Sequence, residues 1–185
     1  MARHSRKQSS LARRARRVRL LLMDVDGVLT DGRIWLLSMP DGTATEMKAF
    51  HAHDGAGLKL AQLGGLRTGL ITGRDSAATT RRAKEVGMEF VYQDCAEKIH
   101  AYNEILQRSG LKDAEVAYVA DDLPDLPILE RAGFAVAVAN AAPEVKRAAH
   151  YVTRTRGGEG AVREVVEVIL KAQDKWRQVL RKARA

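Results

Sequence analysis

The sequence predicts a single α/β domain in which a central parallel sheet has helices on both faces. Three observations indicate this fold. Short apolar segments of strand length alternate with segments of helix length from Asp54 to the C-terminus. The first apolar segment, residues 18–23, resembles a strand that is buried on both faces. The chain has 185 residues, enough to bury a core without disulfides, and it shows no internal repeat.

The predicted elements follow one another in a regular order. After the strand at 18–23 come a hairpin with arms at 34–37 and 43–50, a helix at 58–63, a strand at 68–71, a helix at 76–86 capped by Asp75, a strand at 90–92, a helix at 96–108, a strand at 116–120, a helix at 125–131, a strand at 134–138, a helix at 143–148, an edge strand at 151–152 and a helix at about 160–180. Glycines at 64–65, 110 and 157–158 mark helix ends or chain breaks. Parallel strands joined in this way require right-handed crossovers.

The hairpin is defined by a turn sequence, Pro40-Asp41-Gly42, between its two arms. Its first arm carries Trp35 and two leucines, and an isolated two-stranded ribbon is only marginally stable in water. The ribbon must therefore fold back on the domain or meet another subunit. We expect the second arrangement.

Charge divides the chain into a basic N-terminal segment and a balanced remainder. Residues 1–19 contain eight of the 31 Lys and Arg residues and no acid, which leaves 23 basic against 23 acidic residues elsewhere. We expect residues 1–17 to form a disordered basic tail, 18–173 the folded domain, and 174–185 the end of the last helix and a second basic tail. Two alternatives remain for the first tail. It could be an organelle transit peptide, or it could bind an anionic membrane or nucleic acid, of which nucleic acid is the unlikely partner.

Cysteine content and hydropathy restrict the class of protein further. The single Cys95 excludes an internal disulfide and fits a reducing compartment such as the cytoplasm. No apolar segment approaches the roughly 20 residues that a membrane-spanning helix needs. The sequence therefore predicts a cytoplasmic protein without a membrane span.

Polar residues follow the predicted strands at the positions where ligands bind in open α/β sheets. Asp24 and Asp26 end the first strand, and side chains two apart on extended backbone face the same way. Thr72-Gly73-Arg74 ends another strand and offers a hydroxyl and backbone amides to an anion. Lys98 lies in a first helical turn, where its charge opposes the helix dipole, and Asp121, Asp122 and Asp125 follow a later strand. Together these residues predict a site for phosphate and a divalent metal.

These motifs resemble, in order and spacing, the four motifs of haloacid dehalogenase (HAD)-like phosphatases. The matching residues are 24–31 (DVDGVLTD), 71–74 (ITGR), Lys98 and 121–125 (DDLPD). Residues 50–57 (FHAHDGAG) and 151–164 (YVTRTRGGEGAVRE) look like the capless subgroup that contains 3-deoxy-D-manno-octulosonate 8-phosphate phosphatase. The resemblance extends from about residue 18 to about 173. It implies a Rossmann-like three-layer fold with a protruding hairpin and no cap domain.

The resemblance implies a role for each motif residue. Asp24 is expected to attack phosphorus and form an aspartyl-phosphate, and Asp26 to serve as general acid and then general base. Mg²⁺ is expected on the carboxylates of Asp24 and Asp121 and the backbone carbonyl of Asp26. Thr72 and the Gly73 amide would hold the phosphoryl group. Lys98 would offset its charge, with Asp122 and Asp125 orienting these groups.

The family's substrate contacts fall on Asp26, His51, Ala52, His53, Asp54, Gly55, Lys59, Gly73, Arg74, Arg82 and Lys98. The family also implies a homotetramer whose active sites are completed by a neighbouring subunit. The implied reaction is hydrolysis of 3-deoxy-D-manno-octulosonate 8-phosphate, a step in lipopolysaccharide precursor synthesis. His53 and Lys59 replace arginines that are common in the family, and Glu159 replaces a residue that is often basic or small. Another substrate, such as a nonulosonate 9-phosphate, therefore remains an alternative.

Two functions of other classes are alternatives to a phosphatase: a signalling receiver domain, and a non-catalytic binding or scaffold protein whose basic tail contacts nucleic acid or membrane. A signalling receiver domain places aspartates, a Thr and a Lys around Mg²⁺, but its adjacent acidic pair follows the first strand. Here the adjacent acids, Asp121 and Asp122, come late, which argues against a receiver. A non-catalytic binding protein has no need of the costly pair Asp24 and Asp26. A phosphatase is the function that the sequence favours.

Overall fold

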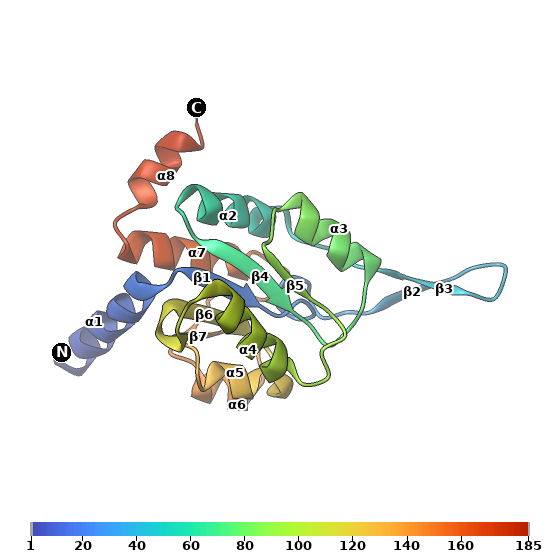
Figure 1. Cartoon of the computed structure of the whole chain (residues 1–185), viewed down its shortest axis with the longest axis horizontal. Helices are drawn as coiled ribbons and strands as arrows, with labels where there is room; N and C mark the ends of the chain where they lie inside the picture. Colours follow the sequence, from blue (N-terminus) through green and yellow to red (C-terminus); the bar gives the residue numbers. More distant parts are fainter. Residues whose placement is uncertain (1, 185) are drawn as a thin grey trace.

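The computed structural model of the chain describes residues 2–184, with side chains described from residue 10 onward. A parallel six-stranded sheet forms its centre (Figure 1). Its strands are β1 (Leu20–Met23), β4 (Arg67–Ile71), β5 (Phe90–Tyr92), β6 (Val116–Ala120), β7 (Phe134–Ala137) and β8 (Tyr151–Val152), arranged in the order β5-β4-β1-β6-β7-β8. The predicted α/β class and parallel sheet are confirmed.

Helices cover both faces of this sheet. They are α1 (Ala2–Arg17), α2 (Ala52–Leu63), α3 (Ala77–Glu85), α4 (Lys98–Ser109), α5 (Leu126–Leu129), α6 (Pro143–Ala148), α7 (Ala161–Ala172) and α8 (Trp176–Lys182), with short 3₁₀ turns at Asp113–Glu115 and Leu123–Asp125. α2 packs on α7 in one layer, and α4, α5 and α6 form the opposite layer (Figure 1). The fold is therefore three-layered, as expected.

β1 lies in the middle of the sheet and is completely buried between its neighbours. Its last residue, Met23, is in register with Leu70 of β4 and Val119 of β6. Because all three strands run the same way, the residues that follow them emerge at one edge of the sheet. This register brings distant parts of the sequence to one place.

The predicted hairpin is present as β2 (Trp35–Ser38) and β3 (Ala44–Met47), an antiparallel pair that projects from the body (Figure 1). Its apolar side chains are exposed to water, with Leu36 at 66% as the extreme. The other exposed apolar residues of this ribbon are Ile34, Trp35, Leu37, Met39 and Met47. Within residues 10–184, nothing in the same chain buries this apolar surface.

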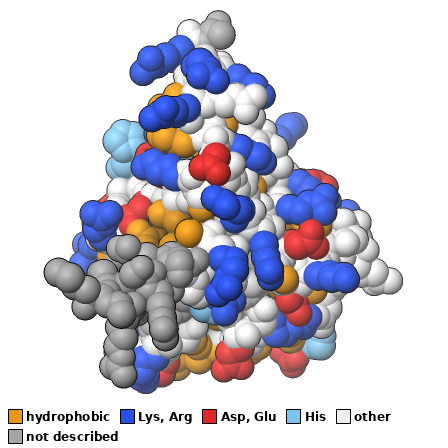
Figure 2. Space-filling model, turned by 90° about the vertical axis from the view of Figure 1, so that its left-hand side faces the viewer, with side chains coloured by type: hydrophobic (Ala, Val, Ile, Leu, Met, Phe, Trp, Pro, Cys, Tyr) orange, Lys and Arg blue, Asp and Glu red, His pale blue; other side chains and the backbone are white. Residues whose placement is uncertain are grey.

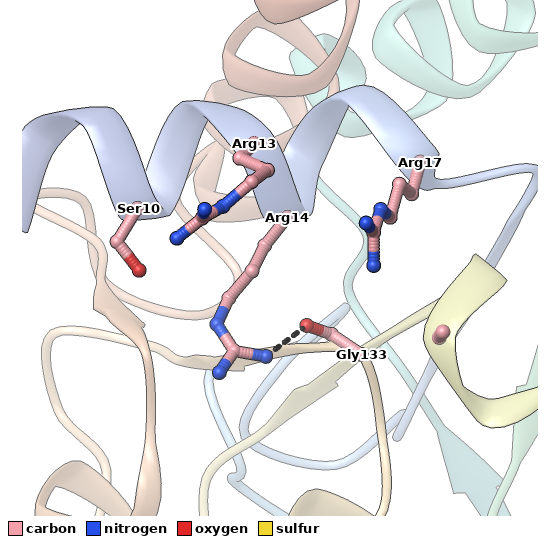
Figure 3. Close-up of a pocket in the computed structure, with 6 residues that line it drawn as sticks. Ser10, Arg13, Arg14, Arg17 and Gly133 are labelled. Carbon is pink, nitrogen blue, oxygen red and sulfur yellow. Dashed lines mark hydrogen bonds between the residues drawn. The ribbon is translucent and has the colours of Figure 1, made fainter.

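The prediction of a disordered N-terminal tail was wrong for the backbone, because residues 2–17 form α1. The reason is apolar burial: Ala15 and Val18 are fully buried in the core. Arg14 donates to the carbonyl of Gly133 at 3.0 Å (Figure 3), and Arg16 donates to that of Ala172 at 2.8 Å. Lys and Arg side chains cover much of the molecular surface on this side (Figure 2).

Three predicted element ends also need correction. The long final helix breaks at Asp174, which has φ of 59°, so that α7 and α8 are separate. α3 is preceded by Ser76 as N-cap rather than by Asp75, and the Ser76 side chain makes no capping hydrogen bond with the described residues. α2 begins at Ala52, six residues before the predicted start, because the His51 ring caps it by accepting from the backbone N–H of His53. In the described chain, none of the helices combines the length and apolar character needed to cross a bilayer.

Candidate active site

A cavity of about 370 Å³ opens at the edge of the sheet where β1, β4 and β6 end. Most of the residues that were predicted to carry chemistry line it. The lining residues are Asp24, Asp26, Gly32, Thr72, Gly73, Arg74, Cys95, Ala96, Lys98, Asp121, Asp122, Pro124 and Asp125. The topology thus brings the four sequence motifs into one site.

Lys98 lies between two carboxylates at the floor of the cavity. Its Nζ is 2.9 Å from Asp24 Oδ1 and donates to Asp125 Oδ1 at 2.7 Å. Asp125 is fully buried and also accepts from the Tyr118 hydroxyl at 2.7 Å. Burial alone would lower the pKa of Lys98, but the charges of Asp24 and Asp125 raise it. These ion pairs explain why a cation is stable in the first turn of α4.

Asp24 and Asp121 are held in a site that disfavours their negative charge. Burial, with the nearby carboxylates, raises the pKa of Asp24 to about 6 and that of Asp121 to about 7. Carboxylate oxygens of Asp24, Asp121 and Asp125 lie within 4.8 Å of one another. Among the described residues, the buried Oδ1 of Asp121 has no hydrogen-bond partner. A bound cation would satisfy these oxygens, and a set of hard oxygen donors suits Mg²⁺.

Gly27 makes room for this cluster. It has φ of +89°, and a Cβ at this position would lie 2.0 Å from Asp121 Oδ2. The loop around Gly27 is also supported from the far end of the sequence. The Gly158 amide donates to the carbonyl of Val28 at 2.9 Å, and a Cβ on Gly157 would collide with the carbonyl of Gly27. The glycine pair near the C-terminus therefore braces the loop that carries the two aspartates.

The turn after β4 presents an open anion-binding surface. Thr72 is anchored by its amide, which donates to the carbonyl of Tyr92 at 2.9 Å. A Cβ on Gly73 would approach only the Cys95 carbonyl, at 3.7 Å, so the backbone here is accessible. The Thr72 hydroxyl and the Gly73 amide can therefore both face a phosphoryl group in the cavity.

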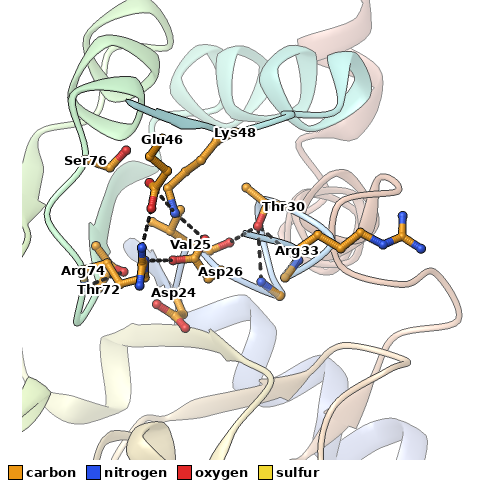
Figure 4. A network of polar contacts seen from close by, with 12 residues as sticks. Asp24, Val25, Asp26, Thr30, Arg33, Glu46, Lys48, Thr72, Arg74 and Ser76 are labelled. Carbon is orange, nitrogen blue, oxygen red and sulfur yellow. Dashed lines mark hydrogen bonds and ion pairs between the residues drawn. The ribbon is translucent and has the colours of Figure 1, made fainter. Parts of the chain in front are cut away.

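Asp26 belongs to a second network that sequence reasoning did not find (Figure 4). Its carboxylate contacts Lys48, which follows β3, and lies near Arg74. Glu46 of β3 pairs with both of these cations. The available signal in the sequence was the spacing of Glu46 and Lys48, which are two residues apart and therefore lie on one face of an extended segment. It is indistinguishable from an ordinary solvated strand face.

The remaining predicted substrate contacts do not line this cavity within the described chain. They are His51, Ala52, His53, Asp54, Gly55, Lys59 and Arg82. His53 instead lines a cavity of about 470 Å³ along α7, and Lys59 is exposed on α2. Arg82 pairs with Glu85 at 3.0 Å and donates to the carbonyl of His51 at 3.4 Å.

Asp54 has a structural task in this chain. It is buried, and its Oδ1 accepts from the backbone N–H of Arg163 at 2.9 Å, in the first turn of α7. Burial raises the pKa of Asp54, although the hydrogen bonds from α7 oppose that shift. Its carboxylate therefore holds α2 and α7 together instead of pointing into the cavity.

Comparison with known proteins agrees with this geometry. A family model described as haloacid dehalogenase-like hydrolase matches residues 75–165. A relative from Yersinia pestis, 3-deoxy-D-manno-octulosonate 8-phosphate phosphatase KdsC, is 43% identical over 162 residues, covering 88% of this chain and 84% of the relative. The protein of the same name from Escherichia coli K12 is 41% identical over the same shares.

A solved structure extends the similarity to three dimensions. It is the 3-deoxy-D-manno-octulosonate 8-phosphate phosphatase of Moraxella catarrhalis, in complex with magnesium, phosphate and the sugar acid. It is 38% identical, with a TM-score of 0.88 and coverage of 94% of this chain and 98% of that one. The four motifs around one cavity and these similarities lead to one conclusion: this chain belongs to the HAD-like hydrolases, in the family of the 3-deoxy-D-manno-octulosonate 8-phosphate phosphatases.

Proposed function

We propose that this chain is a Mg²⁺-dependent phosphatase that converts 3-deoxy-D-manno-octulosonate 8-phosphate to the free sugar acid and phosphate. The observation that carries the proposal is the placement of Asp24 beside Lys98 and Asp121 in the cavity, in a chain 43% identical to an enzyme named for that reaction. The reaction supplies a precursor of lipopolysaccharide. The half-buried free thiol of Cys95 supports a reducing compartment, the cytoplasm, as its place.

In the first step, a carboxylate oxygen of Asp24 attacks phosphorus, and the bond from phosphorus to the sugar oxygen breaks. Asp26 gives a proton to that departing oxygen. In the second step, water attacks the phosphorus of the aspartyl-phosphate, Asp26 takes the proton of that water, and Asp24 is released. Lys98 keeps the attacking carboxylate in place, while Thr72 and the Gly73 amide hold the phosphoryl oxygens.

The residues fit a magnesium ion. Asp24 and Asp121 would supply carboxylate oxygens and Asp26 its backbone carbonyl. Asp125 also lies close, and its Oδ2 has no hydrogen-bond partner among the described residues, but its Oδ1 accepts from both Lys98 and Tyr118, and we assign it to the positioning of Lys98. When bound, the ion neutralises the repulsion between an anionic nucleophile and a phosphate dianion.

We infer that the sugar end of the substrate is bound by residues of a second subunit in a homotetramer. Two observations support this inference. The cluster of residues 51–55, Lys59 and Arg82 does not reach the cavity of its own chain. The hairpin exposes an apolar surface that a subunit contact would bury. Arg74, at the cavity wall, would pair with an anionic group of the sugar acid.

Phosphate release with Mg²⁺ tests the proposal on a panel of phosphorylated sugar acids that includes a nonulosonate 9-phosphate and simple sugar phosphates. We expect the highest kcat/KM on 3-deoxy-D-manno-octulosonate 8-phosphate. Asp24→Asn should abolish release, whereas Asp174→Asn, at an exposed turn, should leave it unchanged. A preference for another sugar acid would refute the substrate assignment. If folded, Mg²⁺-bound protein released phosphate from no member of the panel, the proposal of phosphatase activity would be refuted.

A further inference from the structure

Lys48 is a buried cation at the base of the protruding hairpin. Its side chain is 3% exposed, although it directly follows the strand β3 of the protruding hairpin. Its ammonium group contacts Asp26 Oδ1 and lies 3.3 Å from Glu46 Oε1 (Figure 4). A buried ammonium is stable only with such partners, so the hairpin base and Asp26 hold each other in position.

Glu46 links this lysine to a second cation. It accepts from Arg74 Nη2, and Arg74 Nε lies 3.9 Å from Asp26 Oδ2. The carboxylate of Asp26 therefore has Lys48 at one oxygen and Arg74 beyond the other, with Glu46 behind both cations. Two carboxylates and two cations balance the charge of the network.

The two oxygens of Asp26 are not equivalent in this arrangement. Oδ1 accepts from Lys48, whereas Oδ2 is buried without a hydrogen-bond partner among the described residues. Arg74 Nε at 3.9 Å is too far for a hydrogen bond. A buried oxygen without a hydrogen bond is destabilising, and a substrate oxygen or a water in the cavity would satisfy it.

We propose that Lys48 is a positioning residue for catalysis: it fixes Asp26 Oδ1 and so leaves Oδ2 as the oxygen that gives and takes the proton. This inference rests on the proposed function. Oδ2–H gives its proton to the sugar oxygen as the phosphorus–oxygen bond breaks, and Oδ2 regains a proton from the attacking water. Without Lys48, the carboxylate would turn toward Arg74, the other cation that lies near it among the described residues, and Oδ2 would be occupied.

Lys48→Met tests the proposal, because methionine keeps much of the side-chain length and removes the charge. We expect kcat to fall by about 100-fold or more, as for loss of an acid–base group, with KM changed by less than about threefold. Lys48→Arg should recover part of kcat, since it restores a cation. Lys84→Met, an exposed lysine of α3, is the matched control and should behave as wild type.

Chemical rescue separates positioning from simple packing. n-Propylammonium, which replaces the atoms that the substitution removes, should restore part of kcat when it is added to Lys48→Ala, whereas n-propanol, which has the same number of heavy atoms and no charge, should not. Wild-type kcat in Lys48→Met, or equal rescue by the amine and the alcohol, would overturn the proposal. If Lys48→Met does not fold, Glu46→Gln replaces it in the test, because Glu46 pairs with Lys48. Glu46→Gln should then lower kcat, and a wild-type kcat in Glu46→Gln would overturn the proposal. An inactive wild type would instead refute the proposed function.

Discussion

Replacing Asp121 with asparagine should make the metal-free protein more stable while removing its response to Mg²⁺. The charged form of Asp121 is disfavoured because the group is largely buried and lies among the carboxylates of Asp24, Asp125 and Asp122, which together raise its pKa from 3.8 to about 7. At 1.36 kcal/mol for each tenfold change, this difference corresponds to at most about 4 kcal/mol at pH 7.5. Partial exposure and coupling to Asp24 reduce the gain from Asp121→Asn that we expect to about 1–2 kcal/mol.

The sign of the pH dependence follows from linkage. A carboxyl group whose pKa is raised by folding binds more protons in the folded state, so the contribution of Asp121 to wild-type stability falls as pH rises from about 4 to about 7. The gain in the free energy of unfolding from Asp121→Asn should therefore be complete at pH 7.5 and absent near pH 4. It should appear as a rise in Tm of about 2–8 °C.

Thermal unfolding followed by circular dichroism measures both effects, in EDTA and in Mg²⁺. Wild type should gain Tm with Mg²⁺, and it should gain more at pH 7.5 than at pH 5.5 because protons compete with the ion for Asp24 and Asp121. The Tm of Asp121→Asn should rise little with Mg²⁺ at either pH. Asp174→Asn, on the surface, serves as control. A variant that is less stable than wild type in EDTA, or that responds fully to Mg²⁺, would refute the reasoning.

Three other substitutions test separate parts of the structure. Gly27→Ala should abolish the Mg²⁺-dependent rise in Tm and lower kcat/KM at least 100-fold, because its Cβ would displace Asp121; a normal Tm response would contradict this. Asp54→Ala should lower the free energy of unfolding by about 1–2 kcal/mol in urea titration, since it leaves the Arg163 amide unpaired; unchanged stability would show that Asp54 does not anchor α7. Leu36→Ser with Leu37→Ser should shift the mass measured by light scattering toward monomer, and an unchanged mass would place the subunit contact elsewhere.

The sheet could be predicted because its strands are short apolar segments, most of them followed by glycine or polar residues that favour a turn. The strand predicted at 116–120 and the helix predicted at 143–148 agree with β6 and α6 residue for residue, and Gly110, in the left-handed region, ends α4. The helix at the amino terminus was not predicted, because the prediction considered the local charge of residues 1–17 and not their burial against the rest of the fold. Ala15 packs in the core, which outweighs the repulsion of neighbouring arginines along α1.

The meeting of the proposed catalytic residues in one cavity was predictable, because the carboxyl ends of parallel strands converge and Asp24, Thr72 and Asp121 each follow a strand. Lys48 and Glu46 were not predictable, because their contacts depend on how the hairpin base bends back over Asp26. Nor does spacing in the sequence show that Asp54 caps α7, more than one hundred residues further along the chain. Such contacts depend on the packing of whole elements.

The central claim is that Asp24 carries the phosphoryl group during turnover. The most direct measurement is acid quenching of the enzyme in steady state with Mg²⁺ and 3-deoxy-D-manno-octulosonate 8-phosphate, followed by peptide mass mapping. We predict one phosphoryl group on the peptide that contains Asp24, and neither this adduct nor phosphate release in Asp24→Asn. A phosphoryl group on another residue, or phosphate release by Asp24→Asn at the wild-type rate, would contradict the account.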